Sequence, residues 1–143
     1  MKSIHILLVE DNEGDILLTT EALEEGRIAN KISVVKDGGK AIEFLTSTGA
    51  HPDAVLPDLV LLDINLPRKN GYEVLQYIKE DEKLKQIPVI MLTTSSAEKD
   101  IAYSYQNLAD GYITKPVEVN DFVSTVAKIR DFWIHFVKLP VKK

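Results

Sequence analysis

The stretch Leu59-Val60-Leu61-Leu62-Asp63-Ile64 is an apolar run of strand length that carries one carboxylate near its end. Two further runs, Ile4–Val9 and Val89–Leu92, are also nearly continuous in Ile, Leu and Val. Runs of this kind are typical of strands that are covered on both faces, as in parallel sheets. Two shorter and more mixed runs, at residues 32–35 and 112–113, suit the edges of the same sheet.

Between these runs the sequence places apolar residues at spacings of three and four, which predicts amphipathic helices. The residues that mark the five helical stretches are Leu18, Ala22 and Leu23; Ala41, Ile42, Phe44 and Leu45; Val74, Leu75 and Ile78; Ile101, Tyr105 and Leu108; and Phe122, Val126, Ile129, Trp133 and Phe136. Asp37-Gly38 predicts the start of the second helix, and Asn120-Asp121 predicts the cap of the last one. Strict alternation of strand and helix implies parallel strands joined by right-handed crossovers. The predicted fold is therefore a three-layer α/β/α sandwich around a five-stranded parallel sheet.

The length of 143 residues fits one domain. We expect a single domain over residues 1–143, with a core over about residues 4–130 and an extended final helix and tail over residues 119–143. The one long connection, residues 46–57, contains a glycine and two prolines and is expected to be a loop.

The composition excludes several classes of protein. There are no cysteines, so disulfides, thiolate metal sites and cysteine nucleophiles are ruled out. A formal net charge of −5 disfavours binding to nucleic acid or to an anionic membrane. The apolar runs are far shorter than a spanning helix requires, and the N-terminus lacks a secretory signal. We therefore expect a cytoplasmic protein.

Polar residues stand where the apolar runs end. Glu10-Asp11 follow the first run, Asp63 lies near the end of the third, Thr93 follows the fourth and Lys115 follows the fifth. The carboxyl ends of parallel strands meet at one edge of a sheet, where such folds build their sites. In the doubly wound order 2-1-3-4-5 the first and third strands are neighbours, which would bring the three carboxylates into one shallow pocket.

Three carboxylates in one pocket repel each other unless a cation lies between them. Carboxylate and carbonyl oxygens suit Mg²⁺, and a hydroxyl with an ammonium opposite the metal suits the oxygens of a phosphoryl group. An aspartate can itself be the nucleophile and form an acyl phosphate. The chemistry of these residues therefore predicts metal-assisted phosphoryl transfer to an aspartate.

The same residues carry a resemblance to a known family. The chain resembles the receiver domain of two-component response regulators from Ile4 to about Ile129, with the motifs in the order and spacing of that family. The segments that match are Leu8-Val9-Glu10-Asp11-Asn12, Leu61-Leu62-Asp63-Ile64-Asn65-Leu66-Pro67 with Gly71, Met91-Leu92-Thr93-Thr94 and Thr114-Lys115-Pro116. The resemblance implies a flavodoxin-like fold with strand order 2-1-3-4-5, and a signalling phosphoacceptor that catalyses only its own phosphorylation and dephosphorylation.

The resemblance also implies a role for each acidic residue. Asp63 matches the aspartate that accepts phosphate from the phosphohistidine of a histidine kinase. Asp11 matches a direct Mg²⁺ ligand, and Glu10 matches the second acid, which usually holds the metal through water. Asn65 matches the residue that offers its backbone carbonyl to the metal.

The remaining matched residues surround the phosphoryl group in that family. Thr93 matches the switch hydroxyl that moves to a phosphoryl oxygen, and Lys115 matches the lysine that pairs with another. Pro116 matches the proline that usually follows a cis peptide bond. Tyr112 matches the aromatic residue whose rotamer tracks the threonine.

Simpler interpretations stay open at this point. Asp11 could merely cap the first helix, Thr93 could belong to a polar turn, and Lys115 could be an ordinary solvated lysine. An aspartyl-phosphate hydrolase would also use an aspartate and Mg²⁺, but it needs a general acid two residues after the nucleophile, where this chain has Asn65. A binding module that has lost phosphorylation would be expected to lack some of these polar residues.

The expected partners follow from the family and from the C-terminal sequence. A sensor histidine kinase would donate the phosphate, and the proline-containing loop and the long last helix resemble the stand-alone receivers that partner phytochromes. Too few residues follow Pro116 for a DNA-binding domain, so the expected output is a contact with a downstream protein. The apolar stripe from Phe122 to Trp133 and Phe136 predicts a surface for self-association or for a partner, and we expect a homodimer through the last helix. The alternative is that the tail, residues 137–140, packs back over the sheet of the same chain.

Overall fold

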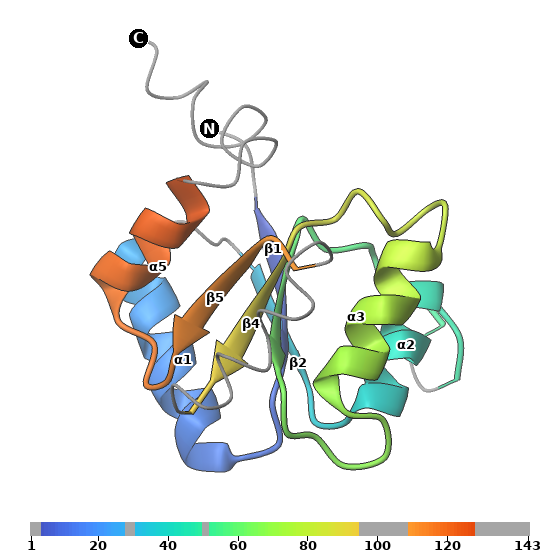
Figure 1. Ribbon diagram of the computed structural model, residues 1–143, viewed down its shortest axis with the longest axis horizontal. Coiled ribbons are helices and arrows are strands. Elements are labelled where there is room, and N and C mark those ends of the chain that lie inside the picture. The colour runs from blue at the N-terminus through green and yellow to red at the C-terminus, as the bar shows by residue number, and fades with distance from the viewer. Residues whose placement is uncertain (1–3, 28–30, 50–51, 95–108, 128–143) are drawn as a thin grey trace, which may run out of the picture.

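The computed structural model describes residues 4–27, 31–49, 52–94 and 109–127. Strands and helices alternate along the chain as far as the fourth strand (Figure 1). The elements are β1 (His5–Val9), α1 (Glu13–Gly26), β2 (Lys31–Val35), α2 (Gly38–Thr46), β3 (Leu59–Asp63), α3 (Gly71–Glu80), β4 (Val89–Thr93), β5 (Gly111–Thr114) and α5 (Val119–Ala127). The helix predicted around Ile101, Tyr105 and Leu108 lies outside the described residues, as do Ile129, Trp133 and Phe136 of the last predicted helix.

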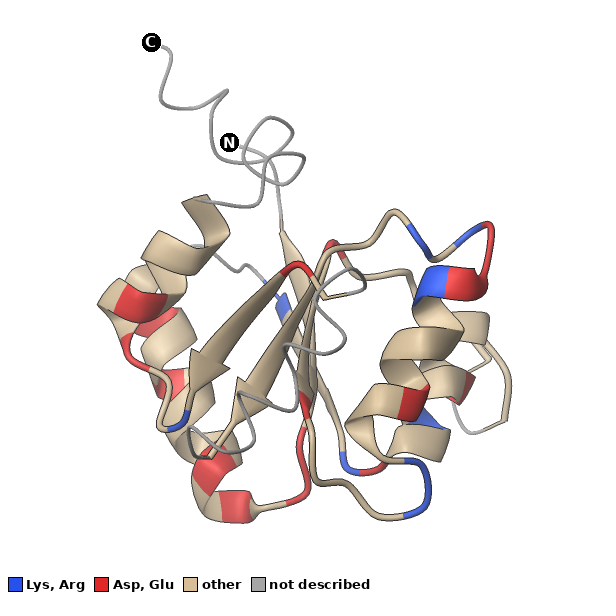
Figure 2. Cartoon of the chain, in the orientation of Figure 1, with Lys and Arg blue, Asp and Glu red and all other residues tan. Residues whose placement is uncertain are grey.

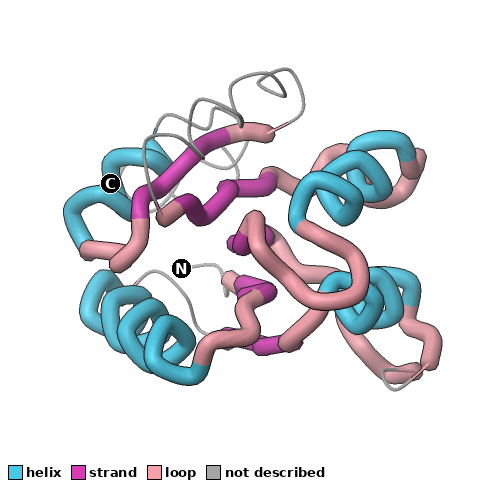
Figure 3. Tube along the Cα trace, turned by 60° about the horizontal axis from the view of Figure 1, so that its bottom comes forward, coloured by secondary structure: helices cyan, strands magenta, loops and turns pink. Residues whose placement is uncertain are grey.

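All five strands are parallel, and their order in the sheet is β2-β1-β3-β4-β5, which confirms the predicted order. The two mixed runs form the edge strands β2 and β5, as their composition predicts. Helices α1 and α5 pack together on one face of the sheet, and α2 and α3 cover the other (Figures 1 and 3). The molecule is therefore the predicted three-layer sandwich.

Each face of the sheet has its own apolar core, because side chains alternate along a strand. Leu7, Val9 and Leu62 belong to the cluster under α2 and α3. Ile6 and Leu8 belong to the cluster under α1 and α5. The central strands β1, β3 and β4 are buried along their whole length, which explains their near-continuous apolar sequences.

The helix starts test the capping predictions. The Asp37 side chain accepts a hydrogen bond from the Lys40 backbone N–H, so the predicted start of α2 is confirmed. The prediction for the last helix is wrong, because α5 begins at Val119 and the Phe122 N–H donates to the Glu118 carbonyl. Asn120 and Asp121 therefore lie inside the first turn.

Helix α1 departs from the predicted apolar stripe. Ala22 and Leu23 are buried as expected, but Leu18 is 47% exposed and Thr19 is buried in its place. Leu17 is exposed as well, so α1 carries apolar residues on its outer side and its periodicity is a poor guide to its buried face. No helix in the described part of the chain has both the length and the apolar character needed to cross a membrane.

Candidate functional site

The strand register brings the predicted site residues to one edge of the sheet. Asp63 is the last residue of β3 and pairs with Leu92 of β4, so Thr93 lies one residue further along the neighbouring strand. Val9 pairs with Leu62, which places Glu10 beside Asp63 across the junction of β1 and β3. These are the carboxyl ends of neighbouring parallel strands, where the topology predicts a site.

Backbone contacts fix the loops that carry these side chains. The Gly71 N–H donates to the Ile64 carbonyl at 2.9 Å, so the loop after β3 folds back over the end of its own strand. A Cβ at Gly71 would lie 2.4 Å from the Asp63 carbonyl oxygen, which only glycine avoids. The Lys115 N–H donates to the Thr93 carbonyl at 2.6 Å, and the bond from Lys115 to Pro116 is a cis peptide.

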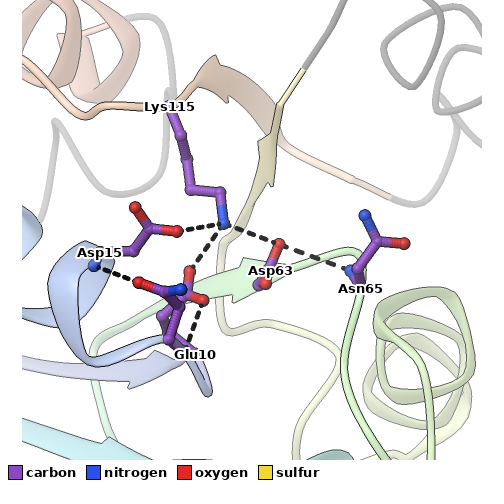
Figure 4. Close-up of polar contacts among 6 residues, drawn as sticks. Glu10, Asp15, Asp63, Asn65 and Lys115 are labelled. Atoms are coloured by element: carbon purple, nitrogen blue, oxygen red, sulfur yellow. Dashed lines mark hydrogen bonds and ion pairs between the residues drawn. The ribbon is translucent and has the colours of Figure 1, made fainter.

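Lys115 is the centre of the polar contacts in Figure 4. Its side chain is only 8% exposed, which rules out an ordinary solvated lysine. The ammonium lies 3.0 Å from Glu10 Oε1, 3.0 Å from Asp15 Oδ2 and 3.4 Å from Asp63 Oδ1. Three carboxylates thus converge on one cation.

The ionisation of Asp63 reflects this crowding. Burial and the neighbouring Glu10 carboxylate raise the pKa of Asp63 to about 7, and Lys115 opposes them. Burial alone would lower the pKa of Lys115, but its hydrogen bonds with Asp15 and Glu10 outweigh that effect and raise it above the usual value. Lys115 is therefore protonated, while Asp63 is close to half-protonated at neutral pH.

The acidic residues at this edge fit a hard divalent cation. Glu10, Asp11 and Asp63 offer carboxylate oxygens that lie within 4.8 Å of one another. Glu10 and Asp63 are buried, whereas Asp11 is exposed and faces solvent on the open side. Asn65 follows two residues after Asp63, and its backbone N–H faces the Asp63 carboxylate at 3.4 Å while its side chain points away (Figure 4). An all-oxygen set of this kind is what Mg²⁺ prefers.

Thr93 ends β4 beside this cluster, and Tyr112 lies on β5 opposite Met91, two residues before Thr93. The Thr93 hydroxyl is completely buried and has no hydrogen-bond partner among the described residues. Buried hydroxyls are normally bonded, so an unpaired one at the end of a strand is suited to an incoming oxygen. Tyr112 is half-buried and packs against the apolar core on the α2 and α3 side of the sheet.

One residue of this cluster escaped the sequence prediction. Asp15 lies in the first turn of α1, three residues after the helix cap Asn12, and its carboxylate binds Lys115. The simpler interpretation in which Asp11 caps the first helix is wrong, because the Asn12 side chain accepts the Asp15 N–H. No motif pointed to Asp15, since acidic residues are common in the first turn of any helix.

The opposite edge of the sheet contains none of these residues. There a pocket of about 660 Å³ lies between the C-terminal ends of α2 and α3 and includes Leu56 from the long loop. His5, which the sequence gives no catalytic partner, is buried at the start of β1 and its Nε2 lies 2.8 Å from Ser33 Oγ. Burial is the main reason that the pKa of His5 is lowered, and its contacts are those of a packed strand residue.

Comparison with known proteins agrees with the geometry. Residues 6–127 match the family model of the response regulator receiver domain. The response regulator Rcp1 of Synechocystis sp. is 42% identical over 135 residues, which cover 94% of this chain and 92% of Rcp1. A structure of Rcp1 in an Mn²⁺-bound form has a TM-score of 0.73 at 40% identity and covers 94% of this chain and 96% of that one.

Two other solved structures are similar over almost their whole length. The bacteriophytochrome response regulator AtBRR has a TM-score of 0.86 at 41% identity, and the match covers 93% of this chain and 96% of that one. The phosphorylated cyanobacterial phytochrome response regulator RcpA has a TM-score of 0.75 at 42% identity, with 94% and 96% covered.

Proposed function

The chain belongs to the response regulator receiver family, and on that premise we propose that Asp63 accepts a phosphoryl group from the phosphohistidine of a sensor histidine kinase. The observation that supports this most strongly is the convergence of a buried aspartate, a buried lysine and an unpaired buried hydroxyl at one sheet edge. The chain then acts as a signalling phosphoacceptor, whose output is a change in protein contacts.

The chemistry of the transfer is a displacement at phosphorus. An Asp63 carboxylate oxygen forms the new bond to phosphorus as the bond to the histidine nitrogen breaks, and the kinase imidazole leaves. Lys115 and Thr93 bind phosphoryl oxygens, the first as a cation and the second as a hydroxyl donor. The Asp63 carboxylate must be ionised to attack, so the groups that lower its pKa promote the reaction.

We propose Mg²⁺ as the metal of this site. Glu10, Asp11 and Asp63 would hold it through carboxylate oxygens, and Asn65 through its backbone carbonyl. When bound, the ion supplies positive charge that neutralises the carboxylates and the transferred phosphoryl group. Glu10 and Asp11 are the residues that would keep this charge next to Asp63.

Phosphorylation would act as a switch through the neighbouring strands. A phosphoryl group adds about −1.5 to −2 charges at neutral pH, which Lys115 and the Thr93 hydroxyl would move to meet. The movement of Thr93 would leave room for Tyr112 to turn inward and would reshape the surface around β5 and α5.

The kinase and the output partner are proteins in this proposal. AtBRR and RcpA are response regulators of phytochromes, so a phytochrome is one candidate for the kinase. A second copy of this chain, bound through the last helix, is a candidate for the output contact. Neither contact involves nucleic acid or a membrane.

The metal and switch assignments can be tested with a small phosphodonor. The wild-type chain should incorporate phosphate with Mg²⁺ and not with excess chelator, and Asp11→Ala should abolish incorporation while leaving the fold intact by circular dichroism. Incorporation by Asp11→Ala at the wild-type rate would contradict the metal assignment.

The switch assignment can be tested by comparing structures with and without beryllofluoride. Thr93 and the loop after it should shift when beryllofluoride binds, and unchanged positions would contradict the switch.

A further inference from the structure

The contacts of Lys115 exceed what phosphoryl binding alone requires. An ammonium group has three N–H donors, and here three carboxylates face them: Glu10 and Asp15 at 3.0 Å and Asp63 at 3.4 Å (Figure 4). To bind a phosphoryl oxygen on Asp63, Lys115 has to move toward the most distant of the three carboxylates and loosen one of its two shorter contacts. Which one yields then affects how readily Asp63 is modified.

The Asp15 side chain is free to bind Lys115 because it has no capping duty. In α3 the acidic residue three positions after the cap, Glu73, accepts the N–H of Asn70 and completes a capping box. In α1 the equivalent N–H, that of Asn12, donates to Glu10 Oε2 at 3.2 Å. The Asp15 carboxylate is instead directed at the Lys115 ammonium, on the side opposite Asp63 (Figure 4).

We propose that Asp15 is a positioning residue that competes with Asp63 for the Lys115 ammonium in the unphosphorylated state. The inference deepens the proposed function and rests on it. In the unphosphorylated state the Lys115 ammonium is shared between Asp15 and Asp63. Phosphorylation of Asp63 then draws the ammonium away from Asp15. The residue thereby limits how strongly the resting site attracts a phosphoryl group.

Exposure decides which contact of Lys115 is exchanged. Glu10 is completely buried, so bulk water cannot take the place of the lysine at its carboxylate. The Asp15 side chain is 31% exposed and can be hydrated when the lysine leaves. Of the two contacts at 3.0 Å, the one with Asp15 is therefore the more readily exchanged.

The competition predicts a gain of function on neutralising Asp15. Asp15→Asn should bind beryllofluoride, in the presence of Mg²⁺, about two- to fivefold more tightly than the wild type, the range expected for removal of a partly exposed ion pair. The signal of the Lys115 ζ-ammonium in NMR spectra of the unmodified protein should also shift, which a change confined to helix stability would not produce.

Glu13→Gln is the matched control. Glu13 lies in the same first turn of α1, pairs with the exposed Lys36 and does not contact Lys115, so its removal takes away the same charge from the same helix end. The affinity of Glu13→Gln for beryllofluoride should stay within twofold of that of the wild type. Its Lys115 signal should not shift. In a Lys115→Met background, Asp15→Asn should no longer increase the affinity.

Three results would overturn the inference. The first is an Asp15→Asn affinity equal to or below that of the wild type, and the second is an equal gain in Glu13→Gln. The third is a gain that persists without Lys115, because Asp15 would then act through general repulsion of the ligand. A wild-type protein that binds no beryllofluoride at all would instead refute the proposed function on which the inference depends.

Discussion

The ionisation of Asp63 is the residue-scale property that links stability to function. Its pKa is raised from 3.8 to about 7 by burial and by Glu10, so the folded protein retains a proton between these two values that the unfolded chain has lost. The bound proton therefore stabilises the folded protein at low pH, and this stabilisation is lost as the pH rises through about 7. One pKa unit corresponds to about 1.4 kcal/mol, so the total change is a few kcal/mol.

We therefore predict that, with chelator present, the free energy of unfolding falls between pH 5 and pH 8. Asp63→Asn should remove most of this dependence, and Mg²⁺ should stabilise the wild type more at pH 8 than at pH 5. Urea denaturation across this range measures both effects. Parallel pH profiles for the wild type and Asp63→Asn would show that Asp63 is not the titrating group.

The unpaired hydroxyl of Thr93 gives a second residue-scale prediction. Replacing it with the isosteric valine removes a buried polar atom that has no partner among the described residues. Thr93→Val should therefore leave the unmodified protein unchanged or stabilise it by about 1 kcal/mol, while weakening beryllofluoride binding. Denaturation and a beryllofluoride titration separate the two effects. A loss of stability above about 1 kcal/mol would mean that the hydroxyl is bonded in the resting state.

At the scale of elements, the loop from β3 to α3 holds Asp63 in place. A methyl group at Gly71 would lie 2.4 Å from the Asp63 carbonyl oxygen, and the nearest atoms all belong to the backbone of Asp63 and Ile64, which has little room to adjust. Gly71→Ala should destabilise the protein by about 2 kcal/mol or more and slow phosphorylation. In Gly26→Ala, the control, the new methyl group meets Val119 at an ordinary 3.7 Å, so that variant should be no less stable than the wild type. Equal stability of the two variants would contradict the role of the close approach.

The elements also show what sequence can and cannot predict here. The strands and their order follow from the apolar runs, and the strand ends identify Glu10, Asp63 and Lys115 as neighbours. Asp15 was missed because it lies a turn into a helix, and only the packing of α1 against the sheet edge brings it to Lys115. Leu18 was wrongly expected to be buried because the outer side of α1 is apolar too.

The whole molecule raises the question of self-association. The sequence predicts a dimer through the last helix, of which the described residues include Val119–Ala127. Sedimentation in the hundreds of micromolar should show a dimer that beryllofluoride tightens and that Trp133→Ala weakens. Leu17→Ala, which changes an exposed apolar residue on α1, is the control and should sediment like the wild type. A monomer under all conditions would exclude the dimer.

The fold of the whole molecule places Asp63 at the junction of β1, β3 and β4, and the ammonium of Lys115, the residue after β5, is directed toward it. The most direct measurement is to identify the phosphorylated residue by mass spectrometry after incubation with Mg²⁺ and a small phosphodonor. We predict a single acyl phosphate on Asp63, absent from Asp63→Asn. An acid-labile phosphate that persists in Asp63→Asn, or that lies on another residue of the wild type, would contradict this account of the site.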